Sequence, residues 1–274
     1  MVVVAVRFFG KQRHARLCSV LTSPLQSTGD PHIDRWGQEP LSFHGECDLV
    51  LAHSDRFHQH SGFDLHIRTT IYEFYSYIES AALQVGKFNL QVEQHGLTLD
   101  DKEVSYDSLP VSFGDEFQYT ITLKEKHADH TKIRVLLHDH SEIFFTYYKH
   151  FLHILVSGNA KDFGDSVGLM GKYGTGELFA RDGSIVEDFE EFAHTWQVNP
   201  ETDPQLFRQV RAPQFPAEKC RMPTVAAPSR RNLRANTEMF NEATEACSHK
   251  QGRHFDLCIE DVMATGDIGM ATAY

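Results

Sequence analysis

The feature that most limits how this chain can fold is the alternation of apolar and polar residues between Leu41 and Ser157. Successive side chains of a strand point to opposite faces, so alternation with a period of two indicates strands that bury one face. The clearest segment places these apolar side chains on one face: Phe117, Tyr119, Ile121 and Leu123. The other face carries Gln118, Thr120, Thr122 and Lys124. The segment predicts a half-buried strand.

Two further segments alternate in the same way. Their apolar residues are Phe88, Leu90 and Val92 in one, and Ile133, Val135 and Leu137 in the other. No helix of about ten or more periodic residues interrupts this region, which argues against a parallel, doubly wound nucleotide-binding sheet. We therefore expect a mainly β fold built from antiparallel strands, as a sandwich or a flattened barrel.

The residues after the β-rich region change in character twice. Residues 199–230 are rich in proline, which predicts an extended linker that wraps around or leaves the β-domain. Residues 231–274 predict a small helical hairpin, because Phe255, Cys258, Ile259, Val262 and Met263 form an amphipathic stripe that Gly266 would end. Phe240, Ala243 and Cys247 mark the preceding helix.

The charge balance excludes some partners. Lys and Arg number 26 and Asp and Glu number 38, so the formal net charge is −12, which disfavours nucleic acid as a partner. No apolar run reaches the roughly 18 to 20 residues that a membrane span requires. We therefore expect neither nucleic-acid binding nor a membrane span in this chain.

The N-terminal segment, residues 1–26, shows no secretory signal peptide. Met1 to Val6 is apolar, but Arg7 ends the run well short of the roughly 7 to 15 residues of a signal core. The basic residues that follow resemble an organelle transit segment, and a truncated or mis-started chain is the alternative.

The five cysteines are Cys18, Cys47, Cys220, Cys247 and Cys258. They are spaced too widely for a CxxC metal site. Four of them could pair and leave Cys18 over, and Cys247 can meet Cys258 across the turn at Gln251 and Gly252. A bond there would stabilise a hairpin too small to be stable alone. The alternative is a set of reduced, buried thiols in a cytosolic protein.

Several motifs, in order and with consistent spacing, resemble a von Willebrand factor type D domain. They are Gly29-Asp30-Pro31-His32, then Phe43-x-Gly45-x-Cys47-Asp48-Leu49-Val50-Leu51, then Gly168-Leu169-Met170-Gly171-Lys172-Tyr173, and finally Phe192 to Val198. Together they span residues 27–198. The resemblance implies two packed antiparallel sheets in an extracellular or cell-surface module, of the kind found in mucins, clotting proteins and adhesion proteins.

The chain also departs from the family pattern. Val167 and Met170 stand where the family has two cysteines that usually cross-link its fold. Cys47 therefore lacks its expected local partner, and we expect it to pair with Cys220, which the linker could bring back against the sheet. Sequence alone leaves the connectivity open.

The resemblance also suggests a calcium site. Family members often bind calcium through the Asp of the opening motif and through Asn or Asp side chains after the later glycine motif, in keeping with the ion's need for several oxygens. Asp30 matches, but Lys172 and Gly174 replace expected ligands, so Asp182 is the only second candidate. The alternative is that Asp30 caps backbone amides in a turn before Pro31.

A third implication is self-cleavage between Asp30 and Pro31. The complete Gly-Asp-Pro-His tetrapeptide resembles the site at which some mucin-type proteins cleave themselves. The Asp30 carboxyl would attack its own peptide carbonyl, and His32 would protonate the proline nitrogen as it leaves. The resulting anhydride could then acylate a neighbouring molecule and cross-link the two.

Seventeen histidines raise the possibility of a transition-metal site. His138 and His140 would share one face if they lay on a strand, and His127 and His130 lie just upstream. A metal-dependent hydrolase would need a third ligand and an open position, and the chain has no HExxH motif. Solvated loop histidines are the alternative.

Other catalytic motifs are absent from the sequence. There is no G-x-S-x-G motif, and the glycine-rich stretch from Gly168 to Gly176 lacks the Lys-Ser/Thr of a phosphate-binding loop, so we expect a tight turn between late strands. Among Tyr72, Phe74, Tyr75 and Tyr77, we expect half to lie in the core and half to face a partner. These observations predict a non-catalytic extracellular structural, adhesion or protein-binding module, with matrix proteins or glycans as partners.

Overall fold

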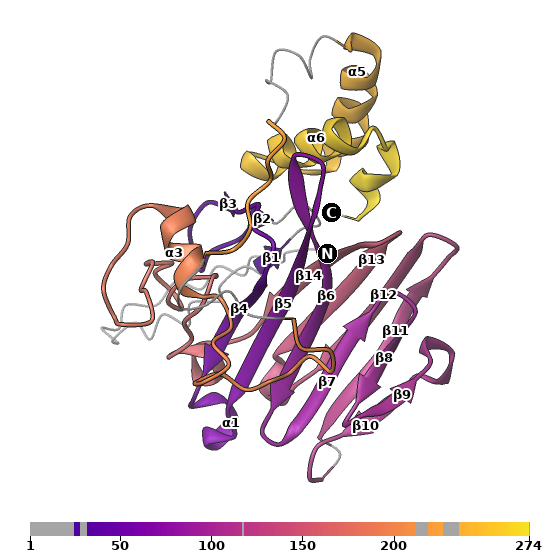
Figure 1. Ribbon diagram of the computed structural model, residues 1–274. Coiled ribbons are helices and arrows are strands. Elements are labelled where there is room, and N and C mark those ends of the chain that lie inside the picture. The colour runs from indigo at the N-terminus through magenta and orange to yellow at the C-terminus, as the bar shows by residue number, and fades with distance from the viewer. Residues whose placement is uncertain (1–24, 28–31, 117, 212–218, 227–235, 274) are drawn as a thin grey trace, which may run out of the picture.

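A computed structural model describes residues 25–27, 32–116, 118–211, 219–226 and 236–273. The strands among these residues form two antiparallel sheets, so the mainly β fold expected from the sequence is confirmed. Figure 1 shows the two sheets stacked, with the C-terminal helices at one end.

The larger sheet has eight strands in the spatial order β10-β11-β12-β13-β14-β1-β2-β3. The strands are β10 (Val111–Phe113), β11 (Tyr119–Lys126), β12 (His130–Leu136), β13 (Glu142–Tyr148), β14 (Phe151–Ser157), β1 (Leu25–Ser27), β2 (His32–Ile33) and β3 (Leu41–Ser42). The short strands β1 to β3 thus extend the edge that β14 would otherwise leave open.

The smaller sheet has six strands in sequence order, β4 to β9. They are β4 (Asp48–Ser54), β5 (Phe63–Tyr72), β6 (Tyr75–Val85), β7 (Phe88–Glu93), β8 (Gly96–Leu99) and β9 (Lys102–Val104). Residues 55–62, which include the helix α1 (Phe57–His60), join β4 to β5, and short turns join the later pairs. Gly86 lies in one such turn with a φ of 60°, a conformation that favours glycine.

The core lies between the two sheets and follows the predicted alternation. Tyr119 and Ile121 on β11 are buried, and so are Ile133 and Val135 on β12. Tyr147 on β13 joins the sheets, because its hydroxyl donates a hydrogen bond to the Glu79 carbonyl of β6 at 2.9 Å. Phe117 lies outside the described residues, so its place on this face stays a prediction.

The helices within the β-domain are short. They are α1 (Phe57–His60), η1 (Tyr106–Ser108), η2 (His138–His140), α2 (Ala160–Phe163) and α3 (Phe189–Thr195). The stretch from Gly168 to Gly176 forms turns as expected, but isolated bridges flank it rather than strands. Val167 pairs with His53 of β4, and Phe179 pairs with Ile185.

The C-terminal region forms the helical hairpin expected from the sequence. Helix α5 (Thr237–Ala246) leads through η3 (Cys247–His249) to α6 (Arg253–Thr265), and η4 (Ile268–Thr272) follows. Gly266 ends α6 in the left-handed conformation, with a φ of 66°. A disulfide joins Cys247 to Cys258.

This helical hairpin packs on the tips of two β-hairpins, one from each sheet. Tyr75 at the β5–β6 tip and Phe151 at the β13–β14 tip are buried with Val262 of α6. Phe74 and Tyr77 are half-buried against the same helices, whereas Tyr72 is 52% exposed. The aromatic strand that the sequence suggested as a partner-facing surface is therefore covered mostly by the chain's own C-terminus.

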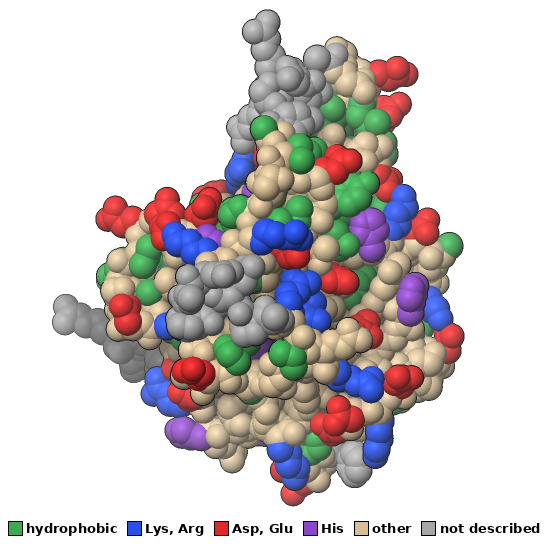
Figure 2. Space-filling view, viewed as in Figure 1, with side chains coloured by type: hydrophobic (Ala, Val, Ile, Leu, Met, Phe, Trp, Pro, Cys, Tyr) green, Lys and Arg blue, Asp and Glu red, His purple; other side chains and the backbone are tan. Residues whose placement is uncertain are grey.

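The surface visible in Figure 2 mixes acidic and basic side chains, and hydrophobic side chains gather over the C-terminal helices. Among the helices in the described part of the chain, none is long and apolar enough to cross a lipid bilayer.

Candidate functional site

Residues 204–211 and 219–222 are together called the strap: the first part lies against the outer face of the six-stranded sheet, and the second part lies beside the segment that leads into β4. Figure 1 shows the first part of the strap crossing the strands β4 to β7. The Asn89 side chain of β7 donates to the Leu206 carbonyl at 2.9 Å, and Gln91 accepts from the Arg208 amide at 2.9 Å. Gln91 is only 5% exposed for this reason, although its strand position is on the polar face.

Arg68 on β5 holds the strap to the sheet. Its guanidinium donates two hydrogen bonds to the Asp48 carboxylate, at 2.8 and 2.7 Å, and a third to the Gln209 carbonyl at 2.8 Å. The same group lies 4.3 Å from the ring centroid of Phe207. The bidentate contact with Asp48 fixes the guanidinium on the sheet, and the guanidinium then holds the strap through the Gln209 carbonyl and the Phe207 ring.

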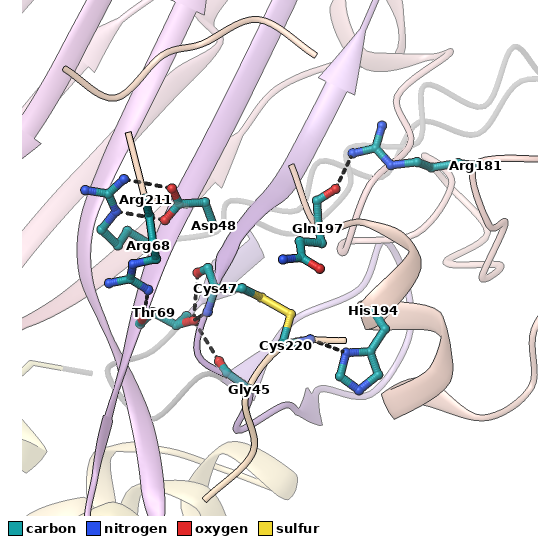
Figure 3. Close-up of a disulfide and its surroundings, with 10 residues drawn as sticks. All are labelled: Gly45, Cys47, Asp48, Arg68, Thr69, Arg181, His194, Gln197, Arg211 and Cys220. Carbon is teal, nitrogen blue, oxygen red and sulfur yellow. Dashed lines mark hydrogen bonds and ion pairs between the residues drawn. A yellow bond between two sulfur atoms is a disulfide. The ribbon is translucent and has the colours of Figure 1, made fainter. Parts of the chain in front are cut away.

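The second part of the strap is covalently attached. Cys220 forms a disulfide with Cys47, 173 residues earlier in the chain, and both residues are 3% exposed. Figure 3 shows this bond between the segment that leads into β4 and helix α3. The Cys220 amide donates a hydrogen bond to Nδ1 of His194 at 3.2 Å. The Cys47 amide donates a hydrogen bond to the Thr69 hydroxyl at 3.0 Å.

Gly45 allows the disulfide to lie close to the backbone. A Cβ atom at this position would meet the Phe43 ring at 2.4 Å and the Cβ of Cys220 at 2.9 Å, which is too close for any side chain. One residue further, the Glu46 amide donates to the Arg221 carbonyl at 2.8 Å. The second part of the strap therefore packs against the Phe43-x-Gly45-x-Cys47 motif.

The later motifs also meet at β4. The Val50 amide donates to the Trp196 carbonyl at 2.9 Å, and the Met170 amide donates to the Leu51 carbonyl at 3.2 Å. Gly168 approaches the backbone so closely that a Cβ would lie 2.7 Å from the Leu51 carbonyl oxygen. Three motifs that are far apart in the sequence thus share one strand.

A small hollow of about 170 Å³ separates the strap from β4. Its lining is Glu46, Cys47, Asp48, Gln197, Val198, Pro200, Gln205, Val210, Arg211 and Arg221. Binding pockets for small molecules usually measure about 300 to 1,000 Å³, so this hollow is too small for a typical substrate. The lining holds a disulfide and paired charges, which is the chemistry of a cross-link rather than of a nucleophile and its base.

The residues expected at the self-cleavage site are only partly described. Asp30 and Pro31 lie outside the described residues. The His32 ring on β2 is 3% exposed and contacts Ser42 through Nδ1, at 2.6 Å from Oγ, and Asp261 through Nε2, at 3.0 Å from Oδ1. The sequence contained one signal for Asp261, because it is an acid on the apolar side of α6 beside Cys258.

The second candidate calcium ligand, Asp182, serves a turn. One of its carboxylate oxygens accepts hydrogen bonds from the Ser184 amide and hydroxyl, at 2.9 and 2.6 Å. These bonds lower the pKa of the Asp182 carboxyl. In the described ranges, no three His, Cys, Asp or Glu side chains are placed to hold a metal ion together. A calcium site at Asp30 therefore remains a prediction.

The prediction that His138 and His140 lie on a strand is wrong. Both residues lie in the turn η2, where the Ser141 amide donates to the His138 carbonyl at 2.9 Å and His140 has a φ of 68°. The alternation of Ile133, Val135 and Leu137 ends here because the chain reverses into β13. His127 and His130 flank the turn at the opposite end of β12.

The fold and the strap together define a disulfide-bonded β-sandwich whose C-terminal helices close one end. No known family model matches the chain, and no curated protein matches it.

Proposed function

We propose that the chain is a non-catalytic extracellular module of structural or adhesive material, a divergent relative of the von Willebrand factor type D domain. The observation that carries the proposal is the buried Cys47–Cys220 disulfide, which ties the strap to the segment that leads into β4. Disulfides persist in oxidising compartments such as the cell exterior and are rare in the cytosol.

Two further observations support a structural role. The Cys247–Cys258 disulfide links the helical hairpin, a piece that is too small to be stable alone. Three hollows, beside Cys47, Lys132 and Asp129, measure about 170, 290 and 270 Å³, all below the usual range for substrate pockets. A rigid, cross-linked scaffold with protein or glycan partners fits these features better than a metabolic enzyme.

Expression in two compartments tests the proposal. The chain is produced in a secretory pathway, with an added signal peptide, and in a reducing cytosol. We expect a folded, protease-resistant product only from the secretory pathway, since both disulfides must form. A chain with reduced cysteines that folds equally well in the cytosol would contradict the proposal.

Self-cleavage between Asp30 and Pro31 is a second candidate. The His32 ring, next to Pro31 in the chain, is fixed through both nitrogens, by Ser42 and by Asp261, so one of these contacts must break before His32 can protonate the proline nitrogen. Incubation of the purified protein near pH 5, followed by mass spectrometry, tests it. A new N-terminus at Pro31, lost on Asp30→Asn substitution, is expected, and an intact chain after prolonged incubation would refute it.

A further inference from the structure

A hollow of about 290 Å³ lies on the outer face of the eight-stranded sheet, where the C-terminal region meets β12, β13 and β14. Its floor is a row of side chains in register across these strands, since Lys132 pairs with Thr146 and Thr146 pairs with His153. Their strand neighbours, such as Ile133 and Phe145, are buried in the core between the sheets. Because side chains alternate along a strand, the row points away from this core.

The C-terminal region supplies the other part of the lining. Lys250, which directly follows η3, lines the hollow together with Thr272 and Ala273 at the end of η4. Figure 1 shows the end of the chain close to β13. A group bound in the hollow would therefore contact the sheet and the C-terminal region at the same time.

Basic side chains dominate the lining. It contains the two lysines Lys132 and Lys250, the two histidines His130 and His153, and one acid, Glu125. With both histidines neutral, two lysines and one glutamate give the lining a charge of +1, in a chain whose formal net charge is −12. Bringing two ammonium groups together costs free energy, which an anion between them would offset.

The one acid does not neutralise Lys132. Glu125 pairs with Lys132 in the strand register, but its carboxylate lies 3.5 Å from Nε2 of His130. Within the described ranges, no carboxylate forms an ion pair with Lys132, and the Lys132 ammonium nitrogen lies 5.4 Å from the Phe144 ring centroid. Nε2 of His130 is buried and forms no hydrogen bond with a described group. The hollow thus offers a ligand both a cation and a ring nitrogen.

The pKa shifts in the hollow have the sign that a positive field produces. Burial, together with nearby groups that include Lys250, lowers the pKa of His153 to about 3. Burial also lowers the pKa of Lys250, with Asp34 opposing this shift and Lys132 adding to it. The basic groups therefore disfavour one another's charged forms, and a bound anion would reverse this effect.

We propose that the hollow binds a small tetrahedral oxyanion, phosphate or sulfate, as the free ion or as the end group of a larger molecule. The ammonium groups of Lys132 and Lys250 supply the charge, and the Thr146 hydroxyl and the His130 ring donate hydrogen bonds. Lysine is a common phosphate ligand that acts as a point charge. Donors on the sheet and on the C-terminal region suit an anion with four oxygens better than a planar carboxylate.

The size of the hollow agrees with such a ligand. Its volume lies just below the roughly 300 to 1,000 Å³ of sites for whole small molecules, so it suits an ion or one end group. The site does not depend on the proposed extracellular function.

Calorimetric titration of the oxidised, tag-free chain in a chloride buffer tests the proposal. The probes are sodium phosphate, sodium sulfate and sodium acetate at equal ionic strength. We expect saturable binding of one phosphate or sulfate ion per chain and weaker binding of acetate. Lys132→Gln and Lys250→Gln should each weaken the affinity about tenfold, because each removes a charge-assisted hydrogen bond. Lys132→Arg keeps the charge and should keep most of the affinity.

The pH dependence of sulfate binding tests the part assigned to His130. Sulfate keeps its charge near neutral pH, so a change in affinity reports the protein. Burial lowers the pKa of His130, Glu125 opposes this shift, and Lys132 and His127 add to it; His153 is the further titratable group beside His130. Bound sulfate favours protonated His130, so the affinity should rise from about pH 8 to pH 6. A flat profile would contradict this assignment.

A phosphate monoester of a sugar distinguishes the two sources of the anion. Binding as tight as that of inorganic phosphate would identify the end group of a larger molecule as the ligand. Binding of inorganic phosphate without binding of the ester would identify the free ion.

The matched control is Lys126→Gln, which makes the same change of charge on the neighbouring strand β11. Lys126 lies outside the lining and forms an ion pair with Asp107 at 2.6 Å. This variant should bind phosphate as the wild type does, and unfolding temperatures in chloride should show that every variant is folded. The proposal is overturned if the wild type shows no saturable binding, or if Lys132→Gln with Lys250→Gln binds as the wild type does. Equal loss of affinity in the control, or acetate binding as tight as phosphate binding, would also overturn it.

Discussion

His32 on β2 and Asp261 on α6 form a buried contact of 3.0 Å between residues 229 positions apart. Neither is open to solvent, since His32 is 3% and Asp261 0% exposed. The contact joins the edge of the eight-stranded sheet to the C-terminal helical hairpin. The hairpin is thus held at three places, the two β-hairpin tips and this polar pair.

We expect Asp261→Ala to destabilise the protein by about 3 kcal/mol, because removing one member of a buried pair leaves its partner without compensation. Urea unfolding of His32→Ala, Asp261→Ala and the double variant measures the coupling, which should be about 1 to 3 kcal/mol. Asp256→Ala, on the exposed side of the same helix, is the control and should cost little. If the two substitutions have additive effects on the free energy of unfolding, the contact between His32 and Asp261 does not stabilise the protein.

The two disulfides should contribute unequally to stability. Loss of chain entropy in the unfolded state predicts about 5 kcal/mol for Cys47–Cys220, with a separation of 173 residues, and about 3 kcal/mol for Cys247–Cys258, with a separation of 11. Denaturant midpoints of Cys47→Ala with Cys220→Ala, and of Cys247→Ala with Cys258→Ala, test this order.

Cys18→Ser serves as the control for the disulfide variants, since Cys18 is left over when four cysteines pair. It should leave the midpoint unchanged. Equal midpoints for the wild type and the Cys47→Ala, Cys220→Ala variant would mean that the strap adds no stability.

Stability should fall as the pH drops from 6.5 towards 4. Burial lowers the pKa of His66 to about 4, against the weaker attraction of Asp64, and burial lowers the pKa of His153 to about 3. An unfolded histidine takes up its proton near pH 6.5, so the unfolded state binds more protons in this window. The two neutral histidines contribute fully to the free energy of unfolding above pH 6.5. His66 alone lowers that free energy by about 3 kcal/mol when the pH falls to 4.

His66→Leu isolates this effect. His66 is fully buried, and among the residues that the structure describes no group forms a hydrogen bond with either ring nitrogen, so an apolar side chain removes both an unsatisfied group and a titrating one. We expect a flatter curve of unfolding free energy against pH, with the variant more stable than the wild type at pH 5. His249→Gln, at an exposed site, is the control. An unchanged slope for His66→Leu would contradict the assignment.

Arg68→Ala should loosen the strap without unfolding the sandwich. It removes the hydrogen bonds to Asp48 and to the Gln209 carbonyl together with the contact on Phe207. We expect faster proteolysis within residues 204–211 and a stability loss of about 1 to 3 kcal/mol. Arg56→Ala, whose side chain is 66% exposed, is the matched control. Equal cleavage rates for the two variants would show that Arg68 does not hold the strap.

Local patterns in the sequence predicted the fold where a single element determines the outcome. The alternation around Ile121 and Val135 identified strands, and the stripe ending at Gly266 identified α6, because period and capping are properties of one segment. His138 was placed on a strand wrongly, since alternation cannot show where a chain reverses.

Long-range contacts could not be predicted from local patterns in the sequence. Gln91 has the spacing of a solvent-facing residue, yet the strap covers it through the Arg208 amide. The stack of His58 on His138 and the pair of His32 with Asp261 join segments that no sequence period relates. Tertiary packing, which sequence spacing does not encode, decides these contacts.

The most direct test of the central claim is the thiol state of native protein, measured by alkylation without reduction, followed by peptide mass mapping. We expect a Cys47–Cys220 peptide pair, a Cys247–Cys258 pair, and alkylation of Cys18 alone. Alkylation of all five cysteines in native material would contradict the disulfide-bonded extracellular module proposed for this chain.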